Sequence, residues 1–209
     1  MRAAARVRTS PRRQAIQPRA RATVDAILEA TARILVREGY DHASTNRIAE
    51  AAGVSIGSLY QYFPSKEALV AALLERHVEE MSAMIGEEAS AVWNAPLPEA
   101  LERVARAMLA AHALDPKLHK VLVEQVPRVG RLERIGEVEK HTLALARTFL
   151  EHRTADLRPG LDLEMAAFVI VATLEALTHG AVLHRPDLLA GDRLVREMRD
   201  VLVRYLIGT

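Results

Sequence analysis

The fold of this chain is decided by residues 44–63, which read STNRIAEAAGVSIGSLYQYF. Two short helical patterns flank a glycine in this stretch. In the first pattern, Ile48, Ala49 and Ala52 lie at i, i+1 and i+4, so one helical face is small and apolar. Gly53 follows where the chain turns sharply, and a positive φ there favours the residue without a Cβ. The spacing therefore predicts two helices that cross closely at a tight turn.

The second helical pattern begins at Ser55, a residue type that caps helix N-termini through its hydroxyl group. Leu59 and Phe63 follow at i and i+4 and are expected to bury against the first helix. The opposite face carries hydroxyl groups, an amide and small side chains, and it has no charge that would repel phosphate. Its members are Ile56, Gly57, Ser58, Tyr60, Gln61 and Tyr62. This pattern predicts a helix-turn-helix that binds DNA, and the competing interpretation is an ordinary packed helical hairpin.

The chemistry of each side chain indicates its role at a DNA surface. Gly57 allows the helix N-terminus, with its free N–H groups and positive dipole end, to approach a phosphate. Gln61 can pair with adenine in the major groove, and Ile56 can contact a thymine methyl group. The hydroxyl groups of Tyr60 and Tyr62 can bind backbone oxygens. We therefore expect Gln61 and Ile56 to read sequence and the tyrosines to position the helix.

This stretch and its neighbours resemble the amino-terminal domain of the tetracycline-repressor-like (TetR) family. The resemblance continues through residues 64–69, which read PSKEAL, and it extends upstream to a helix that ends at Gly39 before Tyr40. That helix has one apolar stripe. The stripe consists of Val24, Ile27, Leu28, Thr31, Ile34 and Leu35. The resemblance covers residues 21–81 and implies an all-α protein whose N-terminal three-helix domain carries the helix-turn-helix.

The resemblance also implies that the second helix of the motif enters the major groove of double-stranded DNA and that the protein is a homodimer. Gln61 stands where many family members have histidine or another polar residue, so the preferred bases do not follow from the resemblance. The predicted DNA-binding residues are Thr45, Arg47, Ser55, Ile56, Gly57, Ser58, Tyr60, Gln61, Tyr62 and Lys66.

Charge is distributed unevenly along the chain. The net charge is +1, yet residues 1–22 carry seven arginines and no acidic residue. A basic arm beside a DNA-binding domain can add phosphate contacts or reach into the minor groove, and the alternative is a disordered tail without that role. We expect this arm at 1–20, the DNA-binding domain at 21–81, and a C-terminal helical domain for ligand binding and dimerisation at 82–209.

Apolar spacing and helix breakers predict the elements of the C-terminal domain. A long helix follows Ser65, a residue that can cap it, and ends at a break over residues 94–98. Arg158, Pro159 and Gly160 mark a turn. Further helices are expected at 97–114, 117–125, 132–152, 162–183 and 187–206.

The helices at 162–183 and 187–206 are expected to form the homodimer interface. The first is apolar around much of its circumference, and the second is amphipathic. The alternative is that both helices close a monomeric bundle. A dimer places two DNA-reading heads on a two-fold axis, so it predicts a palindromic operator.

A small-molecule effector is expected to bind the C-terminal domain and to release the protein from DNA, because ligand and DNA then favour different conformations. For each candidate lining residue the alternative is simple core packing. A different reading of the whole chain is a DNA-bound interaction or dimerisation module that has no small-molecule inducer. The candidate lining consists of Met81, Met84, Trp93, Met108, His112, Phe149, Met165, Phe168 and His179.

Several functional classes find no support in the sequence. The chain has no cysteine, which excludes disulfides and thiolate ligands, and no catalytic, cofactor or metal-binding motif is present. His179 and His184 lie on different faces of a helix, and Glu175 and His179 are expected to form a structural contact. The apolar run that starts at Met165 is too short to span a bilayer before Glu175. We therefore expect a non-enzymatic, cytoplasmic bacterial regulator.

Overall fold

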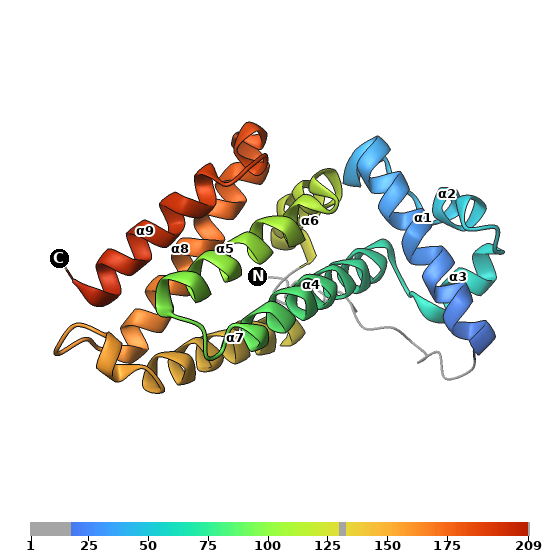
Figure 1. Cartoon of the computed structure of the whole chain (residues 1–209). Coiled ribbons are helices and arrows are strands. Elements are labelled where there is room, and N and C mark those ends of the chain that lie inside the picture. The colour runs from blue at the N-terminus through green and yellow to red at the C-terminus, as the bar shows by residue number, and fades with distance from the viewer. Residues whose placement is uncertain (1–17, 130–132, 209) are drawn as a thin grey trace, which may run out of the picture. The chain divides into compact units, whose positions relative to one another are not determined.

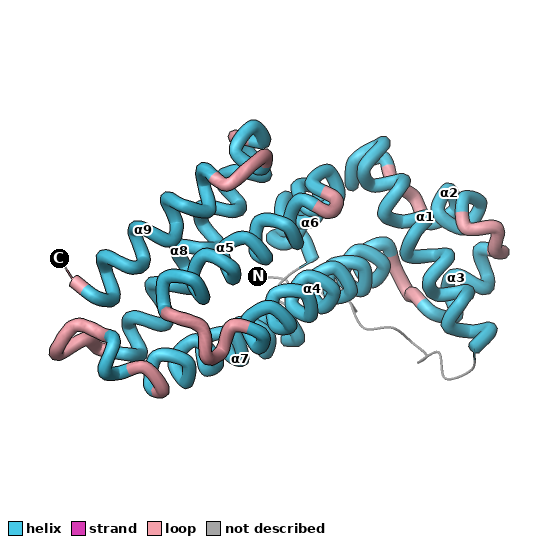
Figure 2. Tube along the Cα trace, viewed as in Figure 1, coloured by secondary structure: helices cyan, strands magenta, loops and turns pink. Residues whose placement is uncertain are grey.

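The computed structural model describes residues 18–129 and 133–208. Within these ranges it describes the backbone throughout and the side chains of all residues except 124–129, 133 and 134. Every regular element in these ranges is helical, which confirms the all-α prediction (Figures 1 and 2). The backbone contacts divide the chain into two compact units. Unit 1 contains the described residues up to Val78 and those of Lys117–Glu133, and unit 2 contains Glu79–Pro116 and the described residues from Arg134 onward.

Unit 1 is built on α1, whose predicted apolar stripe is buried from Ile27 to Leu35, with Val24 partly buried. Gly39 has a φ of 74° and interrupts the helical backbone where the sequence predicted an end, although a last turn follows. The basic arm predicted at 1–20 stays a prediction, because it falls mainly on residues 1–17, outside the described residues. The helices of unit 1 are α1 (Pro18–His42), α2 (Thr45–Ala51), α3 (Ile56–Tyr62), the first half of α4 (Lys66–Ala91) and α6 (Pro116–Val129).

Helix α6 belongs to unit 1 because it packs on α4. The side chains of His77 on α4 and His119 on α6 are both buried, and His77 Nε2 lies 2.9 Å from His119 Nδ1. The predicted domain boundary after residue 81 falls within α4, which contributes residues to both units.

Unit 2 has its core between α5, α8 and α9, which lie side by side in Figure 1. Asp162 caps α8 by accepting hydrogen bonds from the amides of Glu164 and Met165 at 3.0 and 3.1 Å. The fully buried side chains of Leu150, Met198, Leu202 and Leu206 belong to this core. The remaining elements are the end of α4, α5 (Leu97–Ala113), α7 (Glu133–Glu151), η1 (Thr154–Asp156), α8 (Leu163–His184), η2 (Pro186–Leu189) and α9 (Arg193–Ile207).

Two predicted helix boundaries are wrong. Helix α6 continues through Pro127 to Val129, because a proline in the last turn removes only one intrahelical hydrogen bond. Helix α9 begins at Arg193 rather than near Asp187. The short 3₁₀ helix η2 ends at Leu189, and Gly191 then has a φ of 76°, which is incompatible with a right-handed helix. The predicted start of α7 at residue 132 lies outside the described residues.

Helix α8 has an unusual composition for a helix with an exposed side. Among the described residues, α8 is the helix that is long and apolar enough to cross a membrane, with a mean hydropathy of 1.8 over its most apolar stretch. In this structure 39% of that stretch is buried. A core helix of a soluble protein meets the same two criteria. The exposed side chains of α8 include large apolar ones, among them Met165 and Phe168.

Candidate functional site

The helix-turn-helix is held together by the caps and the turn that its sequence predicts. The hydroxyl of Ser44 accepts a hydrogen bond from the amide of Arg47 at 3.3 Å, and Ser55 does the same for Ser58 at 3.0 Å. Gly53 between the two helices has a φ of 68°. These contacts confirm that Ser55 caps the start of the second helix and that the turn needs a residue with a left-handed backbone conformation.

The inner faces of α2 and α3 are buried as predicted. Ile48 and Leu59 are inaccessible to solvent, and Ala49 and Phe63 are almost so. A small residue at Ala49 lets the two helix backbones approach closely. Because this inner face is fully used for packing, the opposite face of α3 points outward in a fixed orientation.

The outward face of α3 carries the residues predicted to contact DNA. Ile56 and Tyr60 are 37% and 40% exposed, Gly57 and Gln61 are exposed, and Tyr62 is partly exposed. A Cβ atom built on Gly57 would meet only Ser55 Oγ, at 3.8 Å, so packing inside the protein does not require a glycine there. The free space at Gly57 leaves the start of α3 open to close approach by another molecule.

Several of the predicted DNA contacts already have partners within the protein. Thr45 Oγ1 and the hydroxyl of Tyr60 lie 2.9 Å apart. The guanidinium of Arg47 contacts both carboxylate oxygens of Glu38, at 2.6 and 2.8 Å, and this ion pair joins α2 to α1. Glu38 also binds Arg37 at 2.6 Å, so one carboxylate pairs with two guanidinium groups beside the motif.

Lys66, at the start of α4, has a structural role that its sequence position does not reveal. Its Nζ donates to the main-chain oxygen of Tyr40 at 2.8 Å and lies 4.1 Å from the centroid of the Tyr40 ring. The Tyr40 hydroxyl donates to Glu67 at 3.0 Å. Burial works to raise the pKa of Glu67, but the backbone amide, Ser65, Tyr40 and Lys66 together lower it. The ammonium group thus ties α4 to the end of α1.

In unit 2 the structure brings together two of the predicted ligand-binding residues. The rings of His112 on α5 and His179 on α8 lie 5.2 Å apart between centroids, and His112 Nδ1 is 2.7 Å from the carbonyl oxygen of Met108. Burial lowers the pKa of His179. Burial, followed by the charge of Glu139, raises the pKa of Glu175, which lies one turn before His179.

A second part of the predicted lining gathers at the ends of α4 and α7. Trp93 and Phe149 meet edge to face with their ring centroids 5.6 Å apart. The buried guanidinium of Arg153 stacks 4.4 Å from the Phe149 centroid and donates to the carbonyl oxygen of Trp93. Of the other predicted lining residues, Met81 is buried and Met108 packs against the core, whereas Met84 is 39% exposed and Met165 and Phe168 are more than half exposed.

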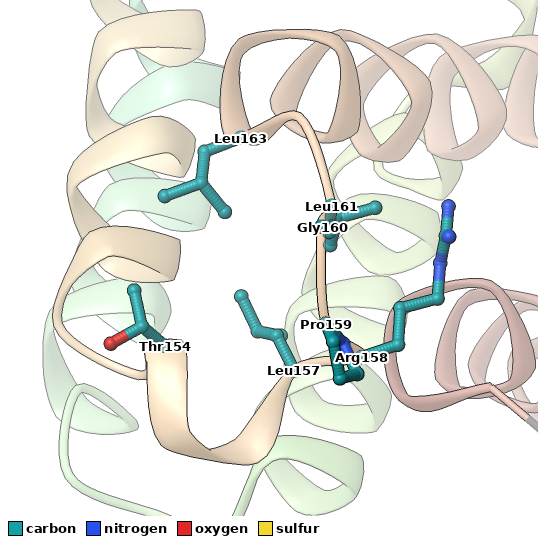
Figure 3. Close-up of a pocket in the computed structure, with 7 residues that line it drawn as sticks. All are labelled: Thr154, Leu157, Arg158, Pro159, Gly160, Leu161 and Leu163. Atoms are coloured by element: carbon teal, nitrogen blue, oxygen red, sulfur yellow. The ribbon is translucent and has the colours of Figure 1, made fainter.

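A surface pocket of about 200 Å³ lies where α7 leads into α8. Figure 3 shows the side chains of Thr154, Leu157 and Leu163 around this hollow, with the Arg158 side chain extending away from it. None of the residues predicted from the sequence to bind a ligand lines this pocket. The lining is completed by Pro159, Gly160 and Leu161.

Comparison with known proteins identifies the family. Residues 27–73 match the family described as bacterial regulatory proteins, tetR family, and residues 96–206 match the tetracyclin repressor-like C-terminal domain. The chain belongs to the TetR family of transcriptional regulators. The first match contains the whole helix-turn-helix, and the second contains α5, α8 and all but the last residue of α9.

Several similar proteins regulate fatty acid metabolism. The fatty acid metabolism regulator protein of Bacillus subtilis is 27% identical over 158 residues, which are 71% of this chain and 78% of the relative. The fatty acid degradation regulator FadR of Bacillus halodurans has a similar structure, with a TM-score of 0.67, 26% identity, and coverage of 87% of this chain and 94% of the other. FadR of Bacillus subtilis, in complex with stearoyl-CoA, has a TM-score of 0.65 and 25% identity, with coverage of 88% and 98%.

Proposed function

We propose that this regulator is a homodimeric repressor that binds a palindromic operator in the bacterial cytoplasm and leaves it when a small molecule binds unit 2. The DNA-binding part of this proposal rests on the outward face of α3. Its side chains are exposed, small or hydrogen-bonding, and the buried inner face fixes their direction. Substitution of Gln61 by Ala is expected to change the preferred duplex sequence, measured by selection from random duplexes. An equal loss of affinity for every sequence would contradict base reading by Gln61.

The proposal of a dimer is supported by the exposed apolar side chains of α8 and α9. Met165, Phe168 and Val201 are each more than half exposed, at 54%, 56% and 52%. Large apolar side chains that gather on an exposed face commonly mark a protein contact. Phe168→Glu is expected to give monomers by analytical ultracentrifugation while circular dichroism stays helical. A dimer that persists unchanged would place the interface elsewhere.

For the effector we propose a long-chain fatty acyl thioester of coenzyme A. The support is the similarity, over most of the chain, to fatty acid regulators, one of them in complex with stearoyl-CoA. The effector must favour the conformation that does not bind DNA, and a shift from 99% to 1% occupancy requires a difference of about 5.5 kcal/mol between the two states.

The test of the effector is a titration of stearoyl-CoA into the complex with a selected operator duplex, with free coenzyme A as the control. Operator affinity is expected to fall with stearoyl-CoA and to stay constant with coenzyme A. By linkage, the duplex must weaken stearoyl-CoA binding by the same factor. If stearoyl-CoA binds tightly and DNA affinity does not change, the second reading applies, in which the protein is a DNA-bound module without this inducer.

A further inference from the structure

Glu38 on α1 is an acidic residue that lies against the helix-turn-helix and is largely buried. Its side chain is 11% exposed, although its two guanidinium partners, Arg37 and Arg47, are both more than half exposed. Gly39 follows it directly with a φ of 74°, so the helical backbone is interrupted immediately after this side chain. Neither capping nor packing within the motif accounts for a carboxylate at this position.

The pair of Glu38 with Arg47 occupies only one edge of the guanidinium group. Such a group has two edges that can each bind an oxyanion, one formed by Nη1 and Nη2 and the other by Nε and Nη2. Arg47 turns the first edge to Glu38, because Nη2 donates to Oε1 at 2.8 Å and Nη1 lies 2.6 Å from Oε2. Within the described parts of the chain, nothing accepts a hydrogen bond from Arg47 Nε. The second edge is therefore open to a ligand from outside the protein.

Arg47 belongs to the end of α2 that adjoins the outward face of α3. It is the third residue of that helix, and the first residue, Thr45, lies 2.9 Å from the hydroxyl of Tyr60 on the outward face. A guanidinium edge can bind a phosphate through two parallel N–H···O hydrogen bonds. An arginine that is already held loses less side-chain freedom when it binds, so the bond forms at a lower entropic cost.

We propose that Glu38 is a positioning residue for DNA binding, which holds the first edge of Arg47 and thereby presents the second edge to a phosphate of the duplex. This inference rests on the proposed function, because it concerns the same DNA-binding surface. The opposite arrangement is a competition in which Glu38 keeps Arg47 away from phosphate. The open Nε edge favours positioning, since a phosphate can bind there while the pair with Glu38 stays intact. Arg37 gives the carboxylate a second cation, which lessens its repulsion of the phosphate.

The test is a double-mutant cycle of Glu38→Gln and Arg47→Ala in the full chain. Glutamine has the size of glutamate and removes the charge that holds Arg47. Affinity for a selected duplex is measured by fluorescence anisotropy over a series of salt concentrations. Arg47→Ala is expected to weaken binding and to reduce the slope of log affinity against log salt by about 0.9. In the Glu38→Gln background, the same substitution is expected to cost about 2- to 10-fold less affinity, because Arg47 is no longer held in advance.

Glu29→Gln is the matched control, because Glu29 is an exposed acidic residue of the same helix and its substitution removes the same charge. Arg47→Ala is expected to cost the same affinity in the Glu29→Gln background as in the wild type. The cycle compares costs between backgrounds, so it separates the hold on Arg47 from any general effect of a lost negative charge. Circular dichroism verifies that each variant is folded.

Arg47→Lys tests the same role without a change to the buried carboxylate, and it serves if Glu38→Gln does not fold. An ammonium group is a point charge without two separate edges, so a lysine paired with Glu38 is expected to lose most of the phosphate contact. Its affinity and salt slope are therefore expected to resemble those of Arg47→Ala.

The outcomes separate this inference from the proposed function. A wild type that binds no duplex would overturn the proposed function itself. If the wild type binds, the positioning role is overturned when Arg47→Ala costs as much or more affinity in the Glu38→Gln background, or when Arg47→Lys binds as the wild type does. A cost that is larger in the Glu38→Gln background would show competition between Glu38 and phosphate.

Discussion

The hydroxyl groups of Thr45 and Tyr60 lie 2.9 Å apart, and the hydrogen bond between them joins the start of α2 to the exposed face of α3. When one hydroxyl donates to the other, the acceptor keeps its own proton for a third partner. The pair can therefore offer an O–H donor to a phosphate while it holds the Tyr60 ring in place. Because a phosphate contact carries no base information, this pair is expected to position the protein.

Tyr60→Phe removes that hydroxyl and retains the ring. We expect affinity to fall by about 1 kcal/mol, the typical net value of one hydrogen bond, and to fall equally for selected and unrelated duplexes. Fluorescence anisotropy with both duplexes measures this. A change in the preferred sequence would instead assign Tyr60 to base reading.

Gly57→Ala separates the needs of the fold from those of DNA binding. Alanine at this helical position meets only Ser55 Oγ, at 3.8 Å, so the free energy of unfolding is expected to stay constant or to rise by up to about 1 kcal/mol. DNA affinity is expected to fall, because the added methyl group stands where the helix N-terminus approaches a phosphate. Chemical denaturation and duplex titration measure the two effects.

The control for Gly57→Ala is Gly86→Ala, within the last third of α4, where a Cβ atom would meet nothing within 4 Å. That variant is expected to stabilise its helix in the same way and to bind DNA as the wild type does. If Gly57→Ala binds DNA with unchanged affinity, the start of α3 does not approach the duplex closely.

Lys66→Ala is expected to have two separable effects, because Nζ both binds the carbonyl of Tyr40 and is predicted to contact a phosphate. Loss of the contacts with Tyr40 lowers the free energy of unfolding, by about 1 kcal/mol for the hydrogen bond. Loss of one phosphate contact weakens binding to all duplexes and reduces the slope of log affinity against log salt by about 0.9. A lower stability with an unchanged salt slope would leave Lys66 with the structural role alone.

Glu102 makes the stability of unit 2 depend on pH. Hydrogen bonds from Arg199 at 2.6 Å and then from Arg106 at 2.9 Å hold the pKa of Glu102 below its ordinary value of 4.5. A carboxyl group with a lowered pKa in the folded state stabilises the protein above its unfolded pKa, and this contribution is lost as the pH falls through the folded pKa. The wild type is therefore expected to have a higher melting temperature than Glu102→Gln at pH 7, and this difference is expected to vanish at acidic pH.

Thermal unfolding from pH 7 to below 4 at constant ionic strength measures the effect of Glu102. Glu99→Gln serves as the control, because Glu99 is more exposed and its pair with Arg103 is 3.9 Å long. A difference between the wild type and Glu102→Gln that stays constant down to the lowest pH would show that packing, and not the ion pairs, explains it.

Local signals in the sequence predict the helices and their ends well, because those depend on residues a few positions apart. The hydroxyl caps at Ser44 and Ser55, the positive φ at Gly53 and the buried pair Leu59 and Phe63 all follow from spacing within two helical turns. The same kind of signal failed at the start of α9. There, Pro186–Leu189 form a separate 3₁₀ helix, and its proline and acidic residue are also typical of the first turn of an α-helix.

The sequence by itself determined an all-α chain with a helix-turn-helix whose outward residues can be named, because helical periodicity and capping are local. Only the tertiary structure decided that Glu38 pairs with Arg47, that Lys66 holds Tyr40, and that His112 meets His179. Each of these contacts joins different helices. Such contacts depend on how packed helices bring distant positions within a few ångströms, and no spacing along the chain encodes that distance.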